Sequence, residues 1–419
     1  MNDFRAIILA AGQGTRMKSS VPKILHPVAG KLIIQHVLDV VKSLRSLKTY
    51  LVLGHQNHVV RKHLTKDIQV VIQDKLLGTA DAVRRTQSFM RGFRGHILIV
   101  CGDTPLLEKN VLRRLMERHQ KTKAVCTVLT AAVDTPTGYG RIIRDAQGTI
   151  RAIREEKDAS FDERTIKEIN SGVYCFRCTE LFATINKIKV NPKKKEFYLT
   201  DIVELLLEQK MLVETLVTDD WSVALGVNTR EDLALAGKIL RERILKNLMS
   251  QGVTIVDPNT TFVDTDVMIG RDTVIHPFTV INSGVKIGRE CSIGPFARLR
   301  PGTTIGNKVE VGNFGEISRS KIGDGTFMKH FGFLGDAVVG SKVNIGAGVV
   351  TANFDGREKH STVIGDQAFI GSDAILVAPA NIGANAVVGA GSVLAKGKTV
   401  PKNSLAVGVP ARIIRRGKK

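Results

Sequence analysis

A short glycine-rich stretch near the start of the chain has the composition of a phosphate-binding loop. Residues 9–17 read LAAGQGTRM and continue the apolar run RAIILAA. Backbone N–H groups freed by glycines can bind phosphate oxygens, and Arg16 adds positive charge at the same place. The stretch lacks the Gly-Lys-Ser/Thr of a Walker A loop, and Met17 stands where a GxGxxG motif has its third glycine. Taken alone, these residues fit an ordinary strand-to-helix turn equally well.

Two further polar residues strengthen the phosphate-binding interpretation. Lys23, in PKILHPVAGK, provides a second cation shortly after the loop. Asp103 follows the apolar run HILIVCGD, at the strand end where an open α/β sheet binds its ligands. A carboxylate beside a basic phosphate loop is a suitable Mg²⁺ ligand, because that ion prefers oxygen. On its own, Asp103 is interpreted equally well as a helix N-cap or a turn residue.

A histidine in the last third of the chain is another candidate for chemistry. His330 lies between two aromatic residues in FMKHFGFLGD, residues 327–336. Histidine suits general-base catalysis because its ordinary pKa lies close to physiological pH. No cluster of His, Cys or carboxylate residues surrounds it at ligand spacing, which disfavours a metal site. The residues alone leave two interpretations, a catalytic base and a histidine with a purely structural position.

The first part of the chain alternates strand-like and helix-like segments. RAIILAA, TYLVLGH, HILIVCGD and AVCTVLTAAV read as buried strands, and IIQHVLDVVKSL reads as a helix. This alternation predicts an α/β domain over residues 1–228, with a mostly parallel, Rossmann-like sheet. A long helix is expected over residues 229–250 as a linker.

Beyond residue 250 an aliphatic residue recurs at every sixth position. Neither a helix nor a simple sheet explains this period. A left-handed parallel β-helix does, since each of its three flat faces takes six residues and points one side chain inward. The residues in phase are Ile269, Ile275, Ile281, Ile287, Ile293, Leu299, Ile305, Val311 and Ile317, and then Ile364, Ile370, Leu376, Ile382, Val388, Leu394 and Val400. Between them a looser stretch, residues 318–363, holds His330 and an expected extended loop, TANFDGREKHST. The sequence predicts a hexapeptide-repeat β-helix domain over residues 251–419.

Composition narrows the class of protein. With 419 residues, 43% of them hydrophobic, the chain is long enough for two domains. The net charge of +21 fits phosphate-bearing substrates, and the basic runs lack the interleaved aromatic residues that single-strand nucleic-acid binding favours. Five cysteines suit a reducing compartment better than a disulfide framework. No signal peptide or membrane-spanning apolar run is recognised, so we expect a cytoplasmic protein with no nucleic-acid partner and no membrane span.

Longer motifs bring a resemblance to a known family. LAAGQGTRM, PK, QDKLLGTADAV, CGDTPL, PTGYGRI, EINSGVY, EFYLTDI and GVNTR occur in the order seen in sugar nucleotidyltransferases, and GPFARLRPG and VNIGAGVVTANFDG follow within the repeats. Over essentially its whole length the chain resembles the bifunctional bacterial family that joins an N-acetylglucosamine-1-phosphate uridylyltransferase to a glucosamine-1-phosphate N-acetyltransferase. The resemblance implies UTP, N-acetylglucosamine-1-phosphate, glucosamine-1-phosphate and acetyl-CoA as substrates, and Mg²⁺ as cofactor. It also implies a homotrimer with acetyl-transfer sites between subunits.

The resemblance assigns roles to residues of the first domain. Asp103 and Asn228 should hold Mg²⁺. Asn228 is also expected among the residues that bind the nucleotide or the sugar. Arg16 and Lys23 should neutralise charge as the sugar phosphate attacks UTP. The residues expected to bind the nucleotide are Leu9, Ala10, Ala11, Gly12, Lys23, Gln73, Gly78 and Thr79, and those expected in the sugar pocket are Gly140, Glu155 and Asn170.

In the second domain the resemblance places His330 at the position of the general base, which takes a proton from the sugar amine. Arg300 matches the cation that holds the sugar phosphate. The positions that match contacts to acetyl-CoA or the sugar are Asn344, Ala347, Asn353, Phe354, Ser372 and Ala390.

Two residues depart from the family pattern. Ser318 stands where the family has a lysine and Phe333 where it has a tyrosine, and both missing groups would contact the phosphorylated sugar. Arg319 could replace the lysine, although consecutive strand residues are expected to point to opposite faces. Two alternatives stay open: a uridylyltransferase whose β-helix is a trimerisation scaffold, and an acetyltransferase for another amino sugar. A regulatory protein that binds nucleotide sugars without turnover is disfavoured by Asp103 and Asn228.

Overall fold

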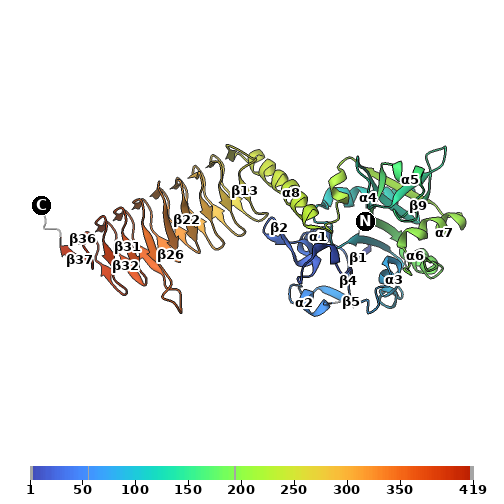
Figure 1. Ribbon diagram of the computed structural model, residues 1–419, viewed down its shortest axis with the longest axis horizontal. Helices are drawn as coiled ribbons and strands as arrows, with labels where there is room; N and C mark the ends of the chain where they lie inside the picture. Colours follow the sequence, from blue (N-terminus) through green and yellow to red (C-terminus); the bar gives the residue numbers. More distant parts are fainter. Residues whose placement is uncertain (1–2, 55, 193–194, 416–419) are drawn as a thin grey trace. The chain divides into compact units, whose positions relative to one another are not determined.

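The structure, a computed structural model, describes residues 3–54, 56–192 and 195–415 (Figure 1). The chain divides into two compact units, one of residues 1–28 and 32–239 and the other of residues 29–31 and 240–419. A helix runs where the sequence predicts one, as α8 (Arg230–Ser250), and the division falls within it. The assignment of one reaction to residues 1–228 and of the other to residues 251–419 stays a prediction.

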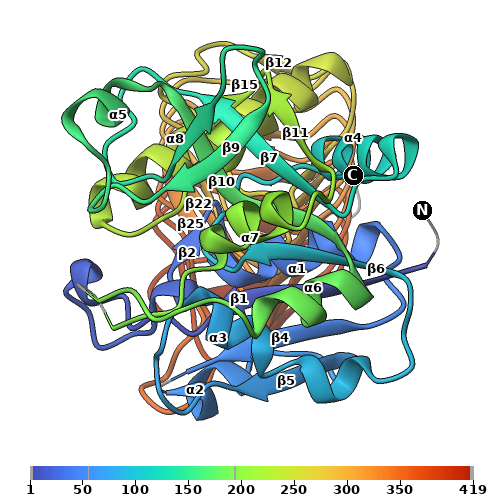
Figure 2. The ribbon, with the colours of Figure 1, turned by 90° about the vertical axis from the view of Figure 1, so that its right-hand side faces the viewer.

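A nine-stranded sheet forms the centre of the first unit. Its main path runs β11 (Val213–Thr218), β7 (Cys126–Ala132), β10 (Glu168–Arg177), β6 (His96–Cys101), β1 (Phe4–Ala10), β4 (Thr49–Leu53) and β5 (Ile68–Ile72). β1 pairs in parallel with β4 and β6, which flank it (Figure 2). β10 runs antiparallel to both of its neighbours, and a hairpin of β8 (Arg141–Arg144) and β9 (Ile150–Arg154) branches from it. The predicted α/β domain is confirmed, and its sheet is mostly parallel along the main path.

Apolar side chains of β1 pack on both faces of this sheet. Ile7 belongs to one hydrophobic cluster and Ile8 to another, and neither is exposed. The first cluster includes residues of α3 (Thr79–Arg84), α6 (Cys178–Ile185) and α7 (Ile202–Glu208), and the second includes residues of α1 (Ile33–Ser43), α2 (Asn57–Arg61) and α4 (Lys109–Thr122). Burial on both faces explains why the strands read as continuous apolar runs. Among the described residues, no helix is long and apolar enough to cross a membrane.

The remaining elements before α8 are short. They are β2 (Pro27–Val28), β3 (Lys31–Leu32), α5 (Phe161–Thr165), and the 3-10 turns η1 (Thr15–Met17), η2 (Lys23–Leu25), η3 (Gln87–Met90), η4 (Leu199–Asp201) and η5 (Trp221–Ala224).

The second unit is a parallel β-helix with three faces. The first face holds β12 (Thr254–Ile255), β15 (Val274–Ile275), β18 (Ser292–Ile293), β21 (Glu310–Val311), β24 (Phe327–Met328), β27 (Asn344–Ile345), β30 (Phe369–Ile370), β33 (Val387–Val388), β36 (Ser404–Val407) and, antiparallel to β36, β37 (Arg412–Arg415). The second holds β13 (Phe262–Val263), β16 (Val280–Ile281), β19 (Arg298–Leu299), β22 (Gly315–Ser318), β25 (Gly332–Gly335), β28 (Val350–Ala352), β31 (Ile375–Val377) and β34 (Val393–Leu394). The third holds β14 (Met268–Ile269), β17 (Lys286–Ile287), β20 (Thr304–Ile305), β23 (Lys321–Ile322), β26 (Ala337–Val339), β29 (Thr362–Ile364), β32 (Ala380–Ile382) and β35 (Thr399–Val400).

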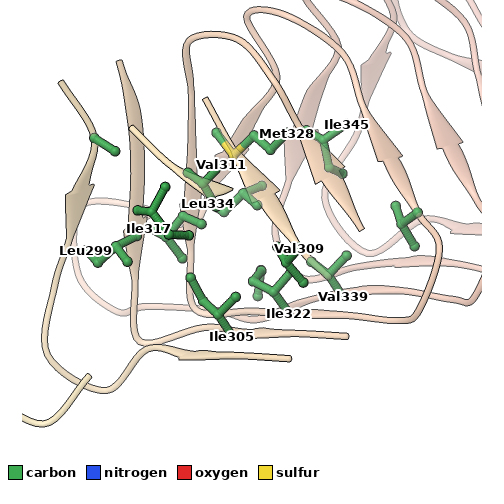
Figure 3. Packing of buried hydrophobic residues seen from close by; sticks show 14 of the residues in the cluster. Leu299, Ile305, Val309, Val311, Ile317, Ile322, Met328, Leu334, Val339 and Ile345 are labelled. Carbon is green, nitrogen blue, oxygen red and sulfur yellow. The ribbon is translucent and has the colours of Figure 1, made fainter. Parts of the chain in front are cut away.

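Inward aliphatic residues of successive coils stack into one continuous core. Leu299, Ile317 and Leu334 lie one above another on the second face, as Figure 3 shows. Ile305 and Ile322 do the same on the third. The predicted architecture, an α/β domain followed by a parallel β-helix with three faces, is confirmed.

The looser stretch of the sequence is not a break in the β-helix. Ile305 pairs with Ile322, seventeen residues on, where earlier partners such as Ile287 and Ile305 are eighteen apart. The corner after β22 lacks one residue, and so does the corner after β25, because Leu334 is followed by Val339 as the next inward residue of the third face. The next corner is instead extended by a loop between β28 and β29. The coils therefore stay stacked while the six-residue count shifts.

Candidate active sites

The glycine-rich loop lies at the carboxyl end of β1, on the rim of a hollow of about 610 Å³. Gly14 adopts φ of 65°, and a Cβ built there would lie 2.7 Å from Cβ of Lys23. Only glycine therefore lets the loop close against Lys23. A Cβ on Gly12 would meet no atom within 4 Å, so the backbone there is open to a ligand.

Most residues predicted for the first site line this one hollow. Its lining residues are Leu9, Ala10, Ala11, Gly12, Gln13, Lys23, Ile24, Gln73, Leu76, Gly78, Thr79, Ala82, Cys101, Asp103, Glu155, Glu196 and Tyr198. Every residue predicted to bind the nucleotide is present, together with Asp103 and Glu155. Arg16, Gly140, Asn170 and Asn228 are not among the lining residues. Arg16 is exposed on η1 and makes no hydrogen bond within the described part of the chain.

Lys23 joins the two residues predicted to hold the metal. Its ammonium group donates to a carboxylate oxygen of Asp103 and, at 2.9 Å, to Oδ1 of Asn228. The Asp103 carbonyl accepts from the Val227 N–H at 2.8 Å, which fixes the chain segment that carries Asn228. The two side-chain oxygens thus converge on one positive charge, as ligands of Mg²⁺ would. Within the described residues no three His, Cys, Asp or Glu side chains cluster around a possible metal position.

The predicted base-binding residues are held by neighbours on two segments. Gln73 is buried, and its Nε2 donates to Oδ2 of Asp81 at 2.9 Å and to the Gly78 carbonyl at 3.0 Å. Its Oε1 has no partner in the described residues and stays available as an acceptor. Gly78 adopts φ of 99°, and a Cβ there would lie 2.5 Å from the Phe197 carbonyl oxygen. Thr79 accepts from the Leu199 N–H at 2.9 Å.

The predicted sugar-pocket residues meet around β10. Thr200 donates to Glu155 at 3.0 Å, and burial is the main cause that raises the pKa of Glu155 above its ordinary value. The Asn170 side chain donates to the Tyr174 hydroxyl at 2.7 Å, and its backbone N–H donates to the Gly140 carbonyl at 2.8 Å. Glu155 therefore faces the hollow, whereas Gly140 and Asn170 brace the sheet beside it.

Several lining residues were missed from the sequence. Glu196 and Tyr198 belong to the motif EFYLTDI, which was recognised without a role for either residue. Burial raises the pKa of Tyr198 to about 12. Burial also raises the pKa of the Cys101 thiol to about 12, so this lining residue stays a neutral thiol at physiological pH. Its position at the end of β6, two residues before Asp103, was the available signal.

In the β-helix, four predicted residues form a column at one corner. The strand register places Ala347 one coil beyond His330, then Ser372 and then Ala390. Backbone hydrogen bonds connect this column, since the Asp373 N–H donates to the Ala347 carbonyl at 2.7 Å and the Gly391 N–H to the Ser372 carbonyl at 2.8 Å.

His330 itself is exposed between β24 and β25. Within the described part of the chain its ring makes no hydrogen bond. Asn344 begins β27, beside Phe327 on the first face. The column therefore presents an unengaged imidazole at an open corner.

The remaining predicted residues of the β-helix lie at the corner after the second face and in its loop. Arg300 donates to Oε1 of Glu316 at 2.9 Å. Asn353 donates to a carboxylate oxygen of Asp336, and Phe354 is 59% exposed at the start of the loop. Asp355 accepts from His360 and Lys396 at 2.7 and 2.9 Å and so ties the loop to a later coil.

The expectation that Arg319 lies on a strand and points away from Ser318 was wrong. Arg319 is not a strand residue: it follows β22 at the shortened corner with φ of 49°. Its Nη1 donates to Oγ of Ser318 at 2.8 Å, so the two side chains meet instead of pointing to opposite faces.

Comparisons with known proteins match both units. The nucleotidyl transferase family profile matches residues 5–223, and the bacterial transferase hexapeptide (six repeats) profile matches residues 266–301 and 361–396. The bifunctional protein GlmU of Shouchella clausii is 42% identical over 398 residues, which cover 87% of this chain and 88% of that protein. GlmU of Pelotomaculum thermopropionicum is 44% identical over 401 residues, 88% of each. Among solved structures, a putative glucose-1-phosphate thymidylyltransferase from Bacillus anthracis covers 56% of this chain and 94% of its own, at 21% identity and a TM-score of 0.48.

Proposed function

The chain belongs to the GlmU family of bifunctional proteins, and we propose that it makes UDP-N-acetylglucosamine in two steps, one in each unit. The β-helix transfers an acetyl group from acetyl-CoA to glucosamine-1-phosphate. The α/β unit then transfers a uridylyl group from UTP to N-acetylglucosamine-1-phosphate and releases pyrophosphate. The convergence of Asp103 and Asn228 on one positive charge beside the glycine-rich loop is the observation that most directly supports the second step.

In uridylyl transfer the chain aligns two anions and neutralises their charge. A phosphate oxygen of the sugar attacks the α-phosphorus of UTP, and pyrophosphate leaves on the opposite side. Backbone N–H groups around Gly12 bind phosphate oxygens, and the cations of Arg16 and Lys23 stabilise the growing negative charge. Asp103 and Asn228 would hold Mg²⁺, which supplies further neutralisation of the phosphates when bound. Lys23 would then be released from both residues to contact phosphate.

Selection of the uracil and of the sugar falls to different lining residues of the hollow. The free Oε1 of Gln73 is placed to accept from a uracil N–H, because its amide nitrogen is already occupied by Asp81 and Gly78. Gly78 brings backbone close to the base, and Thr79 fixes the start of α3. Glu155 faces the sugar hydroxyls.

In acetyl transfer His330 removes a proton from the sugar amine as that amine attacks the thioester carbonyl. The C–S bond then breaks, and CoA leaves as its thiol after taking up a proton. The column Ala347, Ser372 and Ala390 lies beside it and offers a narrow path for acetyl-CoA. Asn344 and the loop residues Asn353 and Phe354 complete the contacts of the acetyl donor and the sugar.

The changed residues support a second candidate, in which this unit acetylates another amino sugar or only assembles the protein. Ser318 is buried and carries no charge, and Phe333 has no hydroxyl. These two residues alter the expected phosphate contacts, whereas the first site has no comparable departure.

An exposed aromatic ladder supports assembly into a homotrimer. Phe278 and Phe296 stack with ring centroids 4.8 Å apart, and Phe296 and Phe314 with centroids 5.1 Å apart. The three side chains are 51, 46 and 59% exposed, and each backbone adopts positive φ. Phe331, next to His330, follows one coil later on the same corner. A second copy packed on this corner would cover the ladder and complete the open site.

The five free thiols support the cytoplasm as the place of action, because a reducing compartment keeps such cysteines unpaired. The two activities are tested separately with full-length protein. Pyrophosphate release from UTP and N-acetylglucosamine-1-phosphate measures the first, and acetyl-CoA consumption across a panel of amino sugar phosphates measures the second. Pyrophosphate release without acetyl-CoA consumption for any acceptor would favour the scaffold alternative.

A further inference from the structure

At the shortened corner after β22, the guanidinium group of Arg319 is held by three hydrogen bonds. Arg319 donates from Nη1 to Oγ of Ser318 at 2.8 Å. It also donates from Nε to Oδ1 of Asp336 at 2.7 Å and from Nη2 to Oδ2 at 2.9 Å. The two parallel bonds to one carboxylate fix the plane of the guanidinium.

Asp336 is itself tied to the next coil. Asn353 donates to the carboxylate oxygen that also accepts from Nη2 of Arg319. Each of these three residues follows the previous one by seventeen positions, because both intervening corners lack one residue. The bonds from Arg319 are the main cause that lowers the pKa of Asp336. The carboxylate therefore stays charged and keeps both partners in place.

Arg319 keeps donors to spare. A guanidinium has five N–H groups, and three of them have partners here, so two remain without one among the described residues. The Arg319 side chain is 38% exposed, so those donors can reach a ligand. A lysine at the same place could not hold one carboxylate in two parallel bonds and still present a fixed pair of donors.

Other cations surround the same corner. Arg300 lies one coil earlier, where its backbone N–H donates to the Ile317 carbonyl at 2.8 Å, and its side chain is paired with Glu316. Lys359, from the extended loop, is close enough to help lower the pKa of Asp336. Three cations thus face two carboxylates, which leaves the corner positively charged and suited to an anion.

The ring of Phe333 borders this corner. A Cβ built on Gly335 would lie 2.6 Å from Cζ of Phe333 and 2.7 Å from Nδ2 of Asn353. The tip of the ring, where a tyrosine would carry its hydroxyl, is therefore next to the side-chain amide of Asn353, which donates to Asp336. Both departures from the family pattern, Ser318 and Phe333, adjoin the Arg319–Asp336–Asn353 network.

We propose that Arg319 binds the phosphate of the amino-sugar acceptor and so determines specificity for a phosphorylated substrate, with Asp336 as its positioning residue. This inference rests on the acetyl transfer proposed above. Ser318, in place of a cationic side chain, leaves room for the guanidinium and orients it through its hydroxyl. The cation that contacts the phosphate is then at position 319 of this chain, one residue after the position at which the family has a lysine.

The test compares Arg319→Gln, Asp336→Asn and wild type as full-length protein. Acetyl-CoA consumption is measured against the concentration of glucosamine-1-phosphate and of unphosphorylated glucosamine. Arg319→Gln should raise KM for glucosamine-1-phosphate about 10- to 100-fold with kcat little changed, the usual loss for charge-assisted hydrogen bonds. Asp336→Asn keeps the cation but loosens it, and should raise the same KM about fivefold. Arg319→Gln should lower kcat/KM far less for glucosamine, which has no phosphate, than for glucosamine-1-phosphate. Arg271→Gln, an exposed arginine of the same β-helix, is the matched control and should leave all constants unchanged.

The outcomes separate the inference from the function on which it rests. A wild-type protein that consumes acetyl-CoA, with an Arg319→Gln variant of unchanged KM, would overturn the inference alone. Equal losses with glucosamine and with its phosphate would also overturn it, since they would indicate a general structural defect. A wild-type protein without acetyl-CoA consumption would overturn the proposed acetyl transfer together with the inference.

Discussion

The two candidate sites of this chain are built in different ways. In the α/β unit, Lys23 meets Asp103 and Asn228 across 80 and 205 residues of sequence, because a parallel sheet brings distant strand ends to one edge. In the β-helix, the residues around His330 recur at coil intervals and stack into columns. The first site closes within one chain around a hollow, whereas the second is a row on an open corner. A solenoid thus supplies a surface for binding, which a neighbouring copy would enclose in the proposed homotrimer.

Carboxylates in the two units also differ, in the direction in which their pKa is shifted. In the α/β unit burial raises the pKa of Glu155 and of Asp201, to about 6 for Asp201. In the β-helix hydrogen bonds from Arg319 lower the pKa of Asp336. Enclosed acids are penalised when charged, and corner acids are stabilised in that state by cations of neighbouring coils.

The largest expected effect separates the two sites completely. Asp103→Ala removes one of the two oxygens that face Lys23 and should lower uridylyl transfer by at least about 10³-fold, since charge neutralisation contributes several kcal/mol. Acetyl transfer should be unchanged. Pyrophosphate release with Mg²⁺ is the measurement, and Asp219→Ala, whose side chain is 93% exposed, is the control. Pyrophosphate release close to wild type would show that Asp103 is not a ligand of the reacting groups.

The reciprocal change concerns the β-helix. His330→Ala should lower kcat for acetyl transfer by about 10²- to 10⁴-fold, the usual contribution of a general base, and should leave pyrophosphate release intact. His276→Ala, another histidine of the β-helix, which is hydrogen-bonded to Ser292 at 3.0 Å, is the matched control. Equal kcat in the two variants would assign His330 a structural position.

A third change tests whether the open corner needs a second copy. Phe296→Glu places a charge in the middle of the aromatic ladder and should prevent association. Light scattering should give three times the 45.7 kDa of one chain for wild type and a smaller mass for the variant. Acetyl transfer should fall with the mass, while pyrophosphate release persists. A monomeric wild-type protein with full acetyl transfer would contradict the shared site.

The smallest effect is a pH dependence of the stability of the α/β unit. Burial, followed by the nearby charge of Glu204, raises the pKa of Asp201 from 3.8 to about 6, so ionisation is penalised in the folded state. The stability contributed at this position should fall as pH rises from about 4 to 6 and stay low above that range. Asp201→Asn should therefore raise the melting temperature at pH 7.5 and have no effect near pH 3.5. Melting curves across this range check it, and a gain that grows toward acid pH would have the wrong sign.

Sequence reasoning succeeded where a rule of geometry applies directly. The six-residue period predicted the β-helix because each face needs one inward residue. Asp103 lines the hollow because strand ends of α/β sheets gather at one edge, and its role as a metal ligand stays a prediction. The partnership of Lys23 with Asn228 has no local signal, since it depends on how the whole sheet and α8 come together.

The shortened corners show the limit of such rules. Deleting one residue at a corner shifts the count after Ile317 and Leu334 without unstacking the coils. That shift made residues 318–363 look irregular, and the prediction for Arg319 failed because it assumed an extended strand. Periodicity reports the faces of a β-helix well, but side chains at its corners depend on local backbone conformation.

The central claim is that this protein carries two activities that work independently of each other, one in the α/β unit and one in the β-helix. The direct measurement is synthesis of UDP-N-acetylglucosamine from glucosamine-1-phosphate, acetyl-CoA and UTP with Mg²⁺, detected by mass spectrometry. We expect product from wild type and far less from Asp103→Ala or His330→Ala alone. Product should form again when the two variants are mixed, because the acetylated sugar can pass between them. A mixture that makes no product, while wild type does, would contradict independent sites.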